Sequence, residues 1–231
     1  MHRTARGITI AAMSRLKVIV VPVTPLQQNC SLVIDTETQR AAVVDPGGDV
    51  PLILNAMTKA GVTVEKILLT HGHIDHAGGA AELREALQVP VEGPEREDDF
   101  LLQTLAETGV RYGIMAARAV TPERWLSHDD TVTVGGIGFR VIHAPGHSPG
   151  SVVYFQPEAK FALMGDVLFQ GSIGRTDLPR GSYDQLMASI HGRILTLGDE
   201  VVFLPGHGSA SQIGHERETN PFIREMEESA E

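Results

Sequence analysis

The most informative part of the sequence is residues 68–79, which read LLTHGHIDHAGG. This stretch holds four side chains of kinds that bind metals, namely His71, His73, Asp75 and His76. It begins with apolar residues typical of a buried strand. In an extended loop, residues i and i+2 face the same side, so His71 and His73 can bind one ion. Asp75 and His76 enter the next turn and project toward a neighbouring position, so the spacing predicts two ions.

One loop cannot complete two coordination shells, so further ligands are expected at the ends of other strands. His147, Asp166 and His207 meet this expectation. Each follows an apolar stretch and has glycine or proline nearby, as a sharp turn requires. We assign the first ion to His71, His73 and His147, the second to Asp75, His76 and His207, and the bridge between them to Asp166. A carboxylate suits the bridging position because its two oxygens can reach ions about 3.5–4 Å apart.

The rest of the chain alternates between strand and helix patterns. Apolar, β-branched stretches predict strands at residues 18–23, 30–34, 41–44, 67–70, 131–134, 139–143, 152–155, 161–164 and 201–204. Helical periodicity appears at residues 51–60, 78–87, 98–108 and 183–195. This order favours an α/β fold with two β-sheets packed face to face and helices outside.

Composition limits the class of protein. The chain has 231 residues and no linker, so we expect one domain over residues 13–231. Residues 1–12 are either an upstream start or a disordered tail. The single cysteine, Cys30, excludes a disulfide scaffold and indicates a reducing cytoplasm, where Cys30 is a small buried hydrophobe. No apolar run approaches the roughly 20 residues of a membrane span, which indicates a soluble protein.

The charge balance indicates which kinds of partner the protein binds. Lys and Arg number 19 against 29 Asp and Glu, a net charge of −10, which disfavours nucleic acid. We expect a small-molecule substrate, no membrane contact, and a monomer or small homo-oligomer.

Three other features have an open role. Residues 92–126 fit a surface helix with a buried stripe, with a lid over the site as the alternative. His143 lies on the predicted strand that precedes His147. It is either a packing residue or a residue that orients a ligand. Residues 45–48 read DPGG, a strand-ending turn.

The ligand pattern resembles a known family. His-x-His-x-Asp-His, followed by isolated His, Asp and His at strand ends, is similar to the metallo-β-lactamase-fold hydrolases over residues 13–224. The resemblance implies an αββα sandwich of two mixed β-sheets, with the site along one edge of both sheets. Many zinc β-lactamases have a cysteine where this chain has Asp166, which argues against antibiotic hydrolysis.

Within that superfamily, residues 165–181 resemble the compact bacterial glyoxalase II (hydroxyacylglutathione hydrolase) proteins, and Asn220-Pro221-Phe222 supports this. The resemblance implies hydrolysis of S-D-lactoylglutathione, or a related acyl-thiol, to D-lactate and glutathione. Two divalent ions are the implied cofactors, with zinc expected and iron or manganese as alternatives. Longer glyoxalase II enzymes have a C-terminal helical domain that helps bind glutathione. Only 24 residues follow His207, so some of those contacts are expected to be missing.

Two alternative functions stay open. The stretch Gly174-Arg175-Thr176-Asp177 also resembles the persulfide dioxygenases, which share the fold but use one iron. A catalytically silent metal-binding protein is the other alternative, and the retention of all the ligands counts against it.

The predicted chemistry is attack by a metal-bound hydroxide on a thioester carbonyl, with Asp75 orienting the water. Thiolate leaves readily, so a separate general acid is less necessary. Arg175 is the candidate for pairing a substrate carboxylate, with a salt bridge to Asp177 as the alternative.

Overall fold

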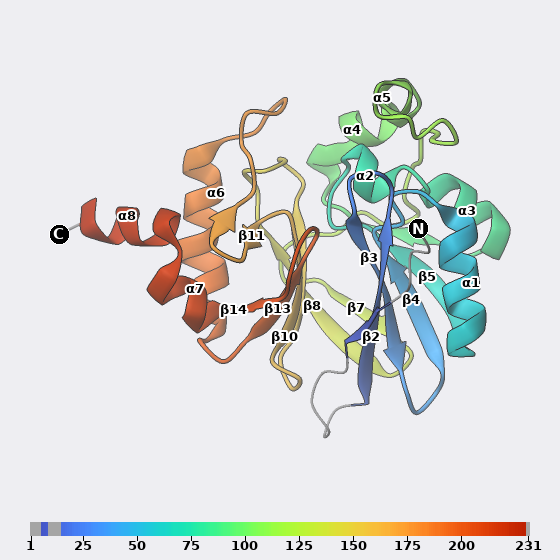
Figure 1. Ribbon diagram of the computed structural model, residues 1–231, viewed down its shortest axis with the longest axis horizontal. Helices are drawn as coiled ribbons and strands as arrows, with labels where there is room; N and C mark the ends of the chain where they lie inside the picture. Colours follow the sequence, from blue (N-terminus) through green and yellow to red (C-terminus); the bar gives the residue numbers. More distant parts are fainter. Residues whose placement is uncertain (1–5, 9–14, 230–231) are drawn as a thin grey trace.

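Two six-stranded β-sheets pack face to face in the computed structural model, which describes residues 6–8 and 15–229 (Figure 1). The first sheet has the order β1-β2-β3-β4-β5-β6, with β1 Arg6–Ile8, β2 Leu16–Val23, β3 Gln28–Asp35, β4 Arg40–Val44, β5 Thr63–Leu68 and β6 Val91–Glu92. The second has the order β14-β13-β10-β9-β8-β7, with β7 Thr131–Val134, β8 Ile137–His143, β9 Val152–Gln156, β10 Phe161–Gly165, β13 Val202–Pro205 and β14 Ser211–Gln212.

Both sheets are mixed. β4 pairs in parallel with β5, and β10 in parallel with β13, whereas β2 and β3 pair antiparallel. A short hairpin of β11 (Leu168–Phe169) and β12 (Ser172–Ile173) follows β10. The predicted fold of two mixed sheets is therefore confirmed.

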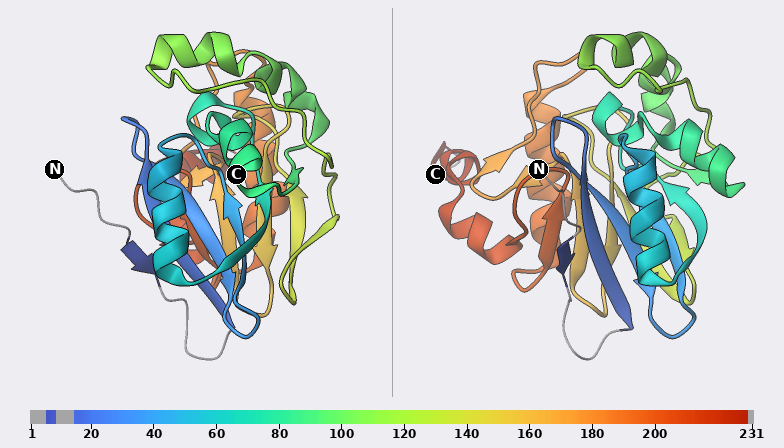
Figure 2. Two further views of the ribbon diagram at one scale, coloured as in Figure 1. Left: turned by 90° about the vertical axis from the view of Figure 1, so that its right-hand side faces the viewer. Right: turned by 45° about the vertical axis from the view of Figure 1, so that its right-hand side comes forward.

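Helices cover the outer faces of both sheets (Figures 1 and 2). Near the first sheet lie α1 Val50–Ala60, α2 Ile74–Ala77, α3 Ala80–Leu87, a 3-10 turn at Arg96–Asp98, α4 Asp99–Gln103 and α5 Leu105–Tyr112. Near the second lie α6 Tyr183–Ser189, a π-helical turn at Ile190–Ile194, a 3-10 turn at Leu195–Leu197, α7 Ile213–Thr219 and α8 Pro221–Ser229. Within the described residues, no helix is both long and apolar enough to cross a membrane.

The strands bury both of their faces because their side chains alternate between two cores. In β2, Val18 and Val20 pack between the sheets, whereas Val21 and Val23 pack under α1. Side chains of successive strand residues point to opposite faces, so one strand supplies two layers. A third core joins the second sheet to α6 and α7 through residues such as Met187.

The predicted elements differ from the observed ones mainly at their ends. The strand expected at 67–70 runs from Thr63 to Leu68, so Leu69 and Thr70 lie outside it and lead into the loop with His71 and His73. The helix expected at 98–108 is broken at Thr104, and the one expected at 183–195 becomes a π-helical and then a 3-10 turn. The short strands β6, β11, β12 and β14 were not predicted, because two residues carry no readable periodicity.

Part of the predicted tail is structured. Within residues 1–12, β1 pairs antiparallel with β2, and the other residues of the tail lie outside the described part of the chain.

Hydrogen bonds join the two sheets at the edge where the predicted ligands lie. Val152 N donates to Thr70 O at 2.8 Å, and Asn29 N donates to Gly206 O at 2.7 Å. The hydroxyl of Tyr154, which is fully buried, donates to Leu69 O at 2.7 Å. The loop after β5 is thus held against β9, and the loop after β13 against β3.

Candidate metal centre

The loop after β5 supplies the first group of polar side chains. Thr70 fixes its start, because Thr70 N and Oγ1 donate to the two carboxylate oxygens of Asp45 at 2.7 and 2.6 Å. His71 and His76 are fully buried. Helix α2 begins at Ile74, so the chain turns there and aims His76 back toward His71, with ring centroids 4.0 Å apart.

A first cluster contains His71, His73 and His147, whose nearest ligand atoms all lie within 4.8 Å of one another. His73 Nδ1 lies 2.9 Å from His147 Nε2. His147 comes from the loop between β8 and β9, and this loop rests directly on α6. A Cβ on Gly146 would lie 2.3 Å from the Leu186 backbone, so only glycine allows this approach.

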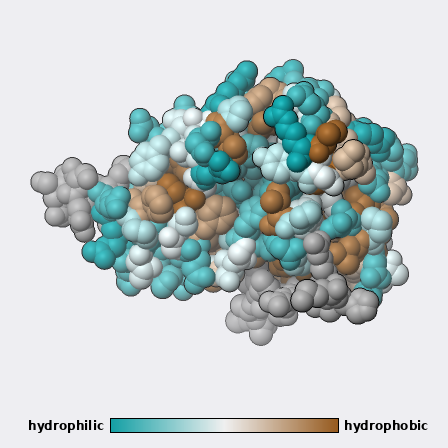
Figure 3. Space-filling view, turned by 45° about the horizontal axis from the view of Figure 1, so that its top comes forward, coloured by the Kyte–Doolittle hydropathy of each residue, from teal (hydrophilic) through white to brown (hydrophobic). Residues whose placement is uncertain are grey.

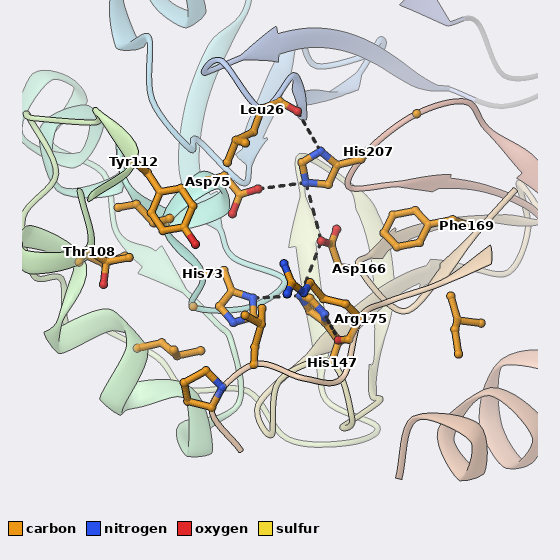
Figure 4. A pocket seen from close by; sticks show the side chains of 18 of the residues that line it. Leu26, His73, Asp75, Thr108, Tyr112, His147, Asp166, Phe169, Arg175 and His207 are labelled. Carbon is orange, nitrogen blue, oxygen red and sulfur yellow. Dashed lines mark hydrogen bonds and ion pairs between the residues drawn. The ribbon is translucent and has the colours of Figure 1, made fainter. Parts of the chain in front are cut away.

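A second cluster contains Asp75, His76 and His207, again with ligand atoms within 4.8 Å. His207 Nε2 lies 3.0 Å from Asp75 Oδ2 (Figure 4). His207 follows β13, which pairs in parallel with β10 and places Pro205 opposite Gly165. This register brings the residues after the two strands side by side.

Asp166, which follows β10, lies between the two clusters. Its Oδ2 is 3.6 Å from His147 Nε2 of the first cluster and 3.7 Å from His207 Nε2 of the second. Its Oδ1 is 3.3 Å from His76 Nε2. One carboxylate therefore faces both clusters, as a bridging ligand must.

The polar atoms that face the centre fit a bound metal. Four of the buried side-chain atoms in these clusters have no hydrogen-bond partner: His71 Nε2, His73 Nε2, His76 Nε2 and Asp166 Oδ1. Buried polar atoms are otherwise almost always bonded, so these unpartnered atoms are suited to coordinate an ion. The residues present therefore fit a bound divalent metal.

In four of these histidines, the ring nitrogen that faces away from the centre contacts a side-chain or backbone oxygen. His71 Nδ1 lies 3.0 Å from Thr70 Oγ1, His76 Nδ1 2.8 Å from Asp45 Oδ2, His147 Nδ1 2.8 Å from Arg175 O, and His207 Nδ1 3.3 Å from Leu26 O. Such contacts fix the tautomer of a metal-binding histidine and orient the ring.

The electrostatic environment suits metal ligation at His71 and Asp166, whereas at His76 the effect of burial is outweighed by Asp166 and Asp75, which raise its pKa. Burial and the neighbouring imidazoles hold the pKa of His71 well below its usual range, so the ring is neutral as a ligand must be. Burial raises the pKa of Asp166, but His76, His147 and His207 outweigh it and lower the pKa, so Asp166 is ionised.

Asp45 belongs to this centre, although the sequence pattern indicated only a turn. Its carboxylate holds both Thr70 and the ring of His76, and it is almost fully buried. Like the ligands at other strand ends, it directly follows an apolar strand and precedes proline and glycine. That signal could have singled it out.

A pocket of about 1140 Å³ opens above the centre, with His73, Asp75, His147, Asp166 and His207 in its wall. Helices α4 and α5 form one side and the β11–β12 region the other (Figure 4). The guanidinium of Arg180 stacks over the ring of Phe100 at 4.2 Å and ties the two sides together. Seen from the end of the molecule with α4 and α5, apolar side chains lie among hydrophilic ones (Figure 3).

The remaining sequence candidates have defined positions. Arg175 lines the pocket but forms a two-pronged ion pair with Asp177, with both contacts at 2.7 Å. His143 Nε2 contacts Pro149 O at 2.8 Å, so it holds the His147 loop rather than a ligand ring. Cys30 is fully buried, and burial raises the pKa of its thiol, as expected of an inert residue. The 92–126 segment has the expected buried stripe, with Leu102 and Leu105 buried, and its helices α4 and α5 border the pocket.

The fold and this centre define a metal-dependent hydrolase of one superfamily. The chain belongs to the metallo-beta-lactamase superfamily, whose family model matches residues 23–207. The resemblance expected from the ligand motif is thus confirmed.

Individual relatives refine this placement. The chain is 40% identical to the "Hydroxyacylglutathione hydrolase GloC" of Haemophilus influenzae over 209 residues, 90% of this chain and 98% of that protein. It superposes on the crystal structure of "BLEG-1 B3 metallo-beta-lactamase" with a TM-score of 0.82 and 35% identity, covering 89% of this chain and 99% of that one. It also superposes on "TTHA1623 in a di-iron-bound form" with a TM-score of 0.79 and 36% identity, covering 88% and 98%.

Proposed function

We propose that the protein is a thioester hydrolase of the glyoxalase II kind, which converts S-D-lactoylglutathione or a related acyl-thiol to the free acid and thiol. The observation that carries the proposal is the pair of three-residue clusters joined by Asp166 on the wall of a large pocket. The 40% identity to a hydroxyacylglutathione hydrolase supports the choice of substrate.

We assign the two clusters to two divalent ions. One ion would be held by His71, His73 and His147, the other by Asp75, His76 and His207, and Asp166 would contact both. Bound there, such ions lower the pKa of a water molecule and polarise a carbonyl group. Zinc, iron and manganese all suit imidazole and carboxylate ligands, and zinc is our expectation. Iron is the main alternative, because a relative at 36% identity has a di-iron-bound form.

The protein's own groups position the reactants. Asp75 reaches the pocket and is fixed by His207, so its carboxylate can accept a hydrogen bond from the attacking water and orient it. The leaving thiolate is stable without a proton, so hydrolysis requires no general acid from the pocket wall.

The pocket suits an anionic thiol with an apolar body. Its wall contains Arg111 and Arg175, which also pair with the exposed carboxylates of Glu107 and Asp177, and apolar side chains such as Leu26, Phe100 and Phe169. Its carboxylates among the described residues, Asp75 and Asp166, both belong to the centre. We therefore propose that the arginines attract the carboxylates of a substrate such as a glutathione thioester.

Arg175→Ala should raise KM for S-D-lactoylglutathione about tenfold and change kcat little, because a charge-assisted hydrogen bond contributes about 1.5–3 kcal/mol. Arg118→Ala is the matched control, since Arg118 forms a similar two-pronged ion pair with Glu85 on the surface. Unchanged kinetics for Arg175→Ala would show that Arg175 serves only its ion pair with Asp177.

Steady-state kinetics with zinc-, iron- and manganese-loaded protein tests the proposal. We expect kcat/KM of about 10⁴ M⁻¹s⁻¹ or more for S-D-lactoylglutathione with at least one metal. Parallel assays measure oxygen consumption with glutathione persulfide and hydrolysis of a β-lactam, the substrate class in the name of one structural relative. Greater activity in either parallel assay would overturn the proposal, and so would metal-loaded protein that is silent in all three.

A further inference from the structure

Asp98 is a fully buried carboxylate that the centre described above does not include. It lies at the end of the 3-10 turn Arg96–Asp98, directly before α4. Burying an ionised group without compensation is unfavourable. Accordingly, burial raises the pKa of Asp98 to about 6, although three hydrogen bonds oppose this rise.

The three donors to Asp98 come from the two loops that carry the first cluster. Gly72 N, between His71 and His73, donates to Oδ2 at 2.8 Å. Ser148 Oγ, next to His147, donates to the same oxygen at 2.8 Å, and Gly150 N donates to Oδ1 at 2.6 Å.

These loops belong to different sheets, since the first follows β5 and the second joins β8 to β9. Asp98 belongs to neither loop and forms hydrogen bonds with both of them. These two loops carry His73 and His147, whose ring nitrogens lie 2.9 Å apart. A shift of either loop would change that spacing.

Two glycines allow Asp98 to lie this close. A Cβ on Gly72 would lie 2.8 Å from Leu101 Cβ and 3.1 Å from Asp98 O. A Cβ on Gly150 would lie 2.7 Å from Asp98 Cγ and 2.5 Å from Glu95 O. The glycine in His-Gly-His is therefore needed for contact with the turn before α4 and with Leu101.

The same turn leads into the pocket wall. Phe100 and Leu101 of α4 line the pocket, one and two residues after Asp99, and α4 lies over the end of the sheets (Figure 1). The Asp98 carboxylate thus connects the wall that faces the substrate with both loops of the first cluster.

We propose that Asp98 is a positioning residue that holds the His71–His73 loop and the His147 loop at the spacing required by the first metal ion. It acts through Gly72, Ser148 and Gly150 and touches neither metal nor substrate. The proposal rests on metal binding at the first cluster and is independent of which substrate is hydrolysed.

Asp98→Asn is the sharpest test, because the substitution keeps the volume of the side chain and replaces one acceptor oxygen with an NH₂ donor. The serine hydroxyl can reverse its role, but a backbone N–H cannot. In either orientation of the amide, Gly72 N or Gly150 N therefore faces another donor and loses its bond.

The measurement is binding of Co²⁺ to the full-length protein, by competition with a chelator and by visible absorption, which reports coordination geometry. Loss of a residue that orients metal ligands typically weakens metal affinity about 10- to 100-fold, and we expect a loss in that range with a changed cobalt spectrum. Asp99→Asn is the matched control, because Asp99 bonds Gln103 on the surface at 2.9 Å, and it should bind like the wild type.

A variant with lower Tm but wild-type cobalt affinity and spectrum would overturn the proposal, since a purely structural role predicts that result. If Asp98→Asn does not fold, Ser148→Ala carries the test, because it removes one of the three donors and keeps the carboxylate. It should weaken cobalt binding and change the spectrum, and wild-type values would again overturn the proposal. Neither readout uses a thioester, so the outcome is independent of the assay for hydrolysis.

Discussion

Asp75→Ala and His76→Ala should each lower kcat/KM for thioester hydrolysis at least about a thousand-fold, equivalent to roughly 4 kcal/mol of transition-state stabilisation. Each substitution removes a proposed ligand of the second ion, and Asp75→Ala also removes the carboxylate that orients the attacking water. Asp75, His76 and His207 lie within 4.8 Å of one another, so the loss of one leaves two protein ligands in that cluster.

The fold should survive both substitutions, because the cores between and outside the sheets are untouched. Circular dichroism should match the wild type, and His215→Ala, which changes an exposed histidine on α7, should retain full activity. Wild-type activity in both Asp75→Ala and His76→Ala, with two ions still bound to each, would rule out the roles assigned to Asp75 and His76.

Gly47→Ala should destabilise the protein by about 3 kcal/mol, at the upper end of the usual cost of overpacking. A Cβ at position 47 would lie 1.5 Å from Asp75 O, so the turn at residues 45–48 and the backbone of α2 cannot both stay in place. The turn is also joined to Gly79, directly before α3, by a hydrogen bond from Gly79 N to Pro46 O at 2.8 Å. For a domain of this size the loss corresponds to a fall in Tm of about 6–12 °C.

Thermal unfolding monitored by circular dichroism measures this effect. Gly192→Ala is the control, because a Cβ there would have no heavy atom within 4 Å, and alanine favours helix. We expect its Tm to be unchanged or slightly raised. A Tm for Gly47→Ala within 2 °C of the wild type would show that the turn does not pack against α2 as described.

The layered fold was predictable because its signal is repeated along the chain. The central strands alternate side chains between two apolar cores, which makes them visible as apolar, β-branched runs. The strands of two residues and the break at Thr104 were not predictable, because tertiary contacts rather than local periodicity fix them. The C-terminal helices were missed for a related reason. Glu216 and Asn220 are buried polar residues that bond the β11–β12 hairpin, so the amphipathic pattern is interrupted.

The grouping of the candidate ligands could be predicted because strand ends meet at one sheet edge. His71 and His73 share a loop, and the parallel register of β10 with β13 places Asp166 near His207. The residues that hold these candidate ligands in place were harder to predict from the sequence. Asp45 and Asp98 act through contacts between segments 25 or more residues apart, and a single carboxylate in a sequence carries no sign of its distant donors.

The number and position of the bound ions test the central claim most directly. Anomalous diffraction at the zinc edge, from crystals of zinc-loaded protein, should show two peaks about 3.5–4 Å apart, the usual spacing of a two-metal site. One peak should lie among His71, His73 and His147, and the other among Asp75, His76 and His207, with Asp166 in contact with both. A single peak at full zinc occupancy, or two peaks of which one lies away from these side chains, would contradict the account.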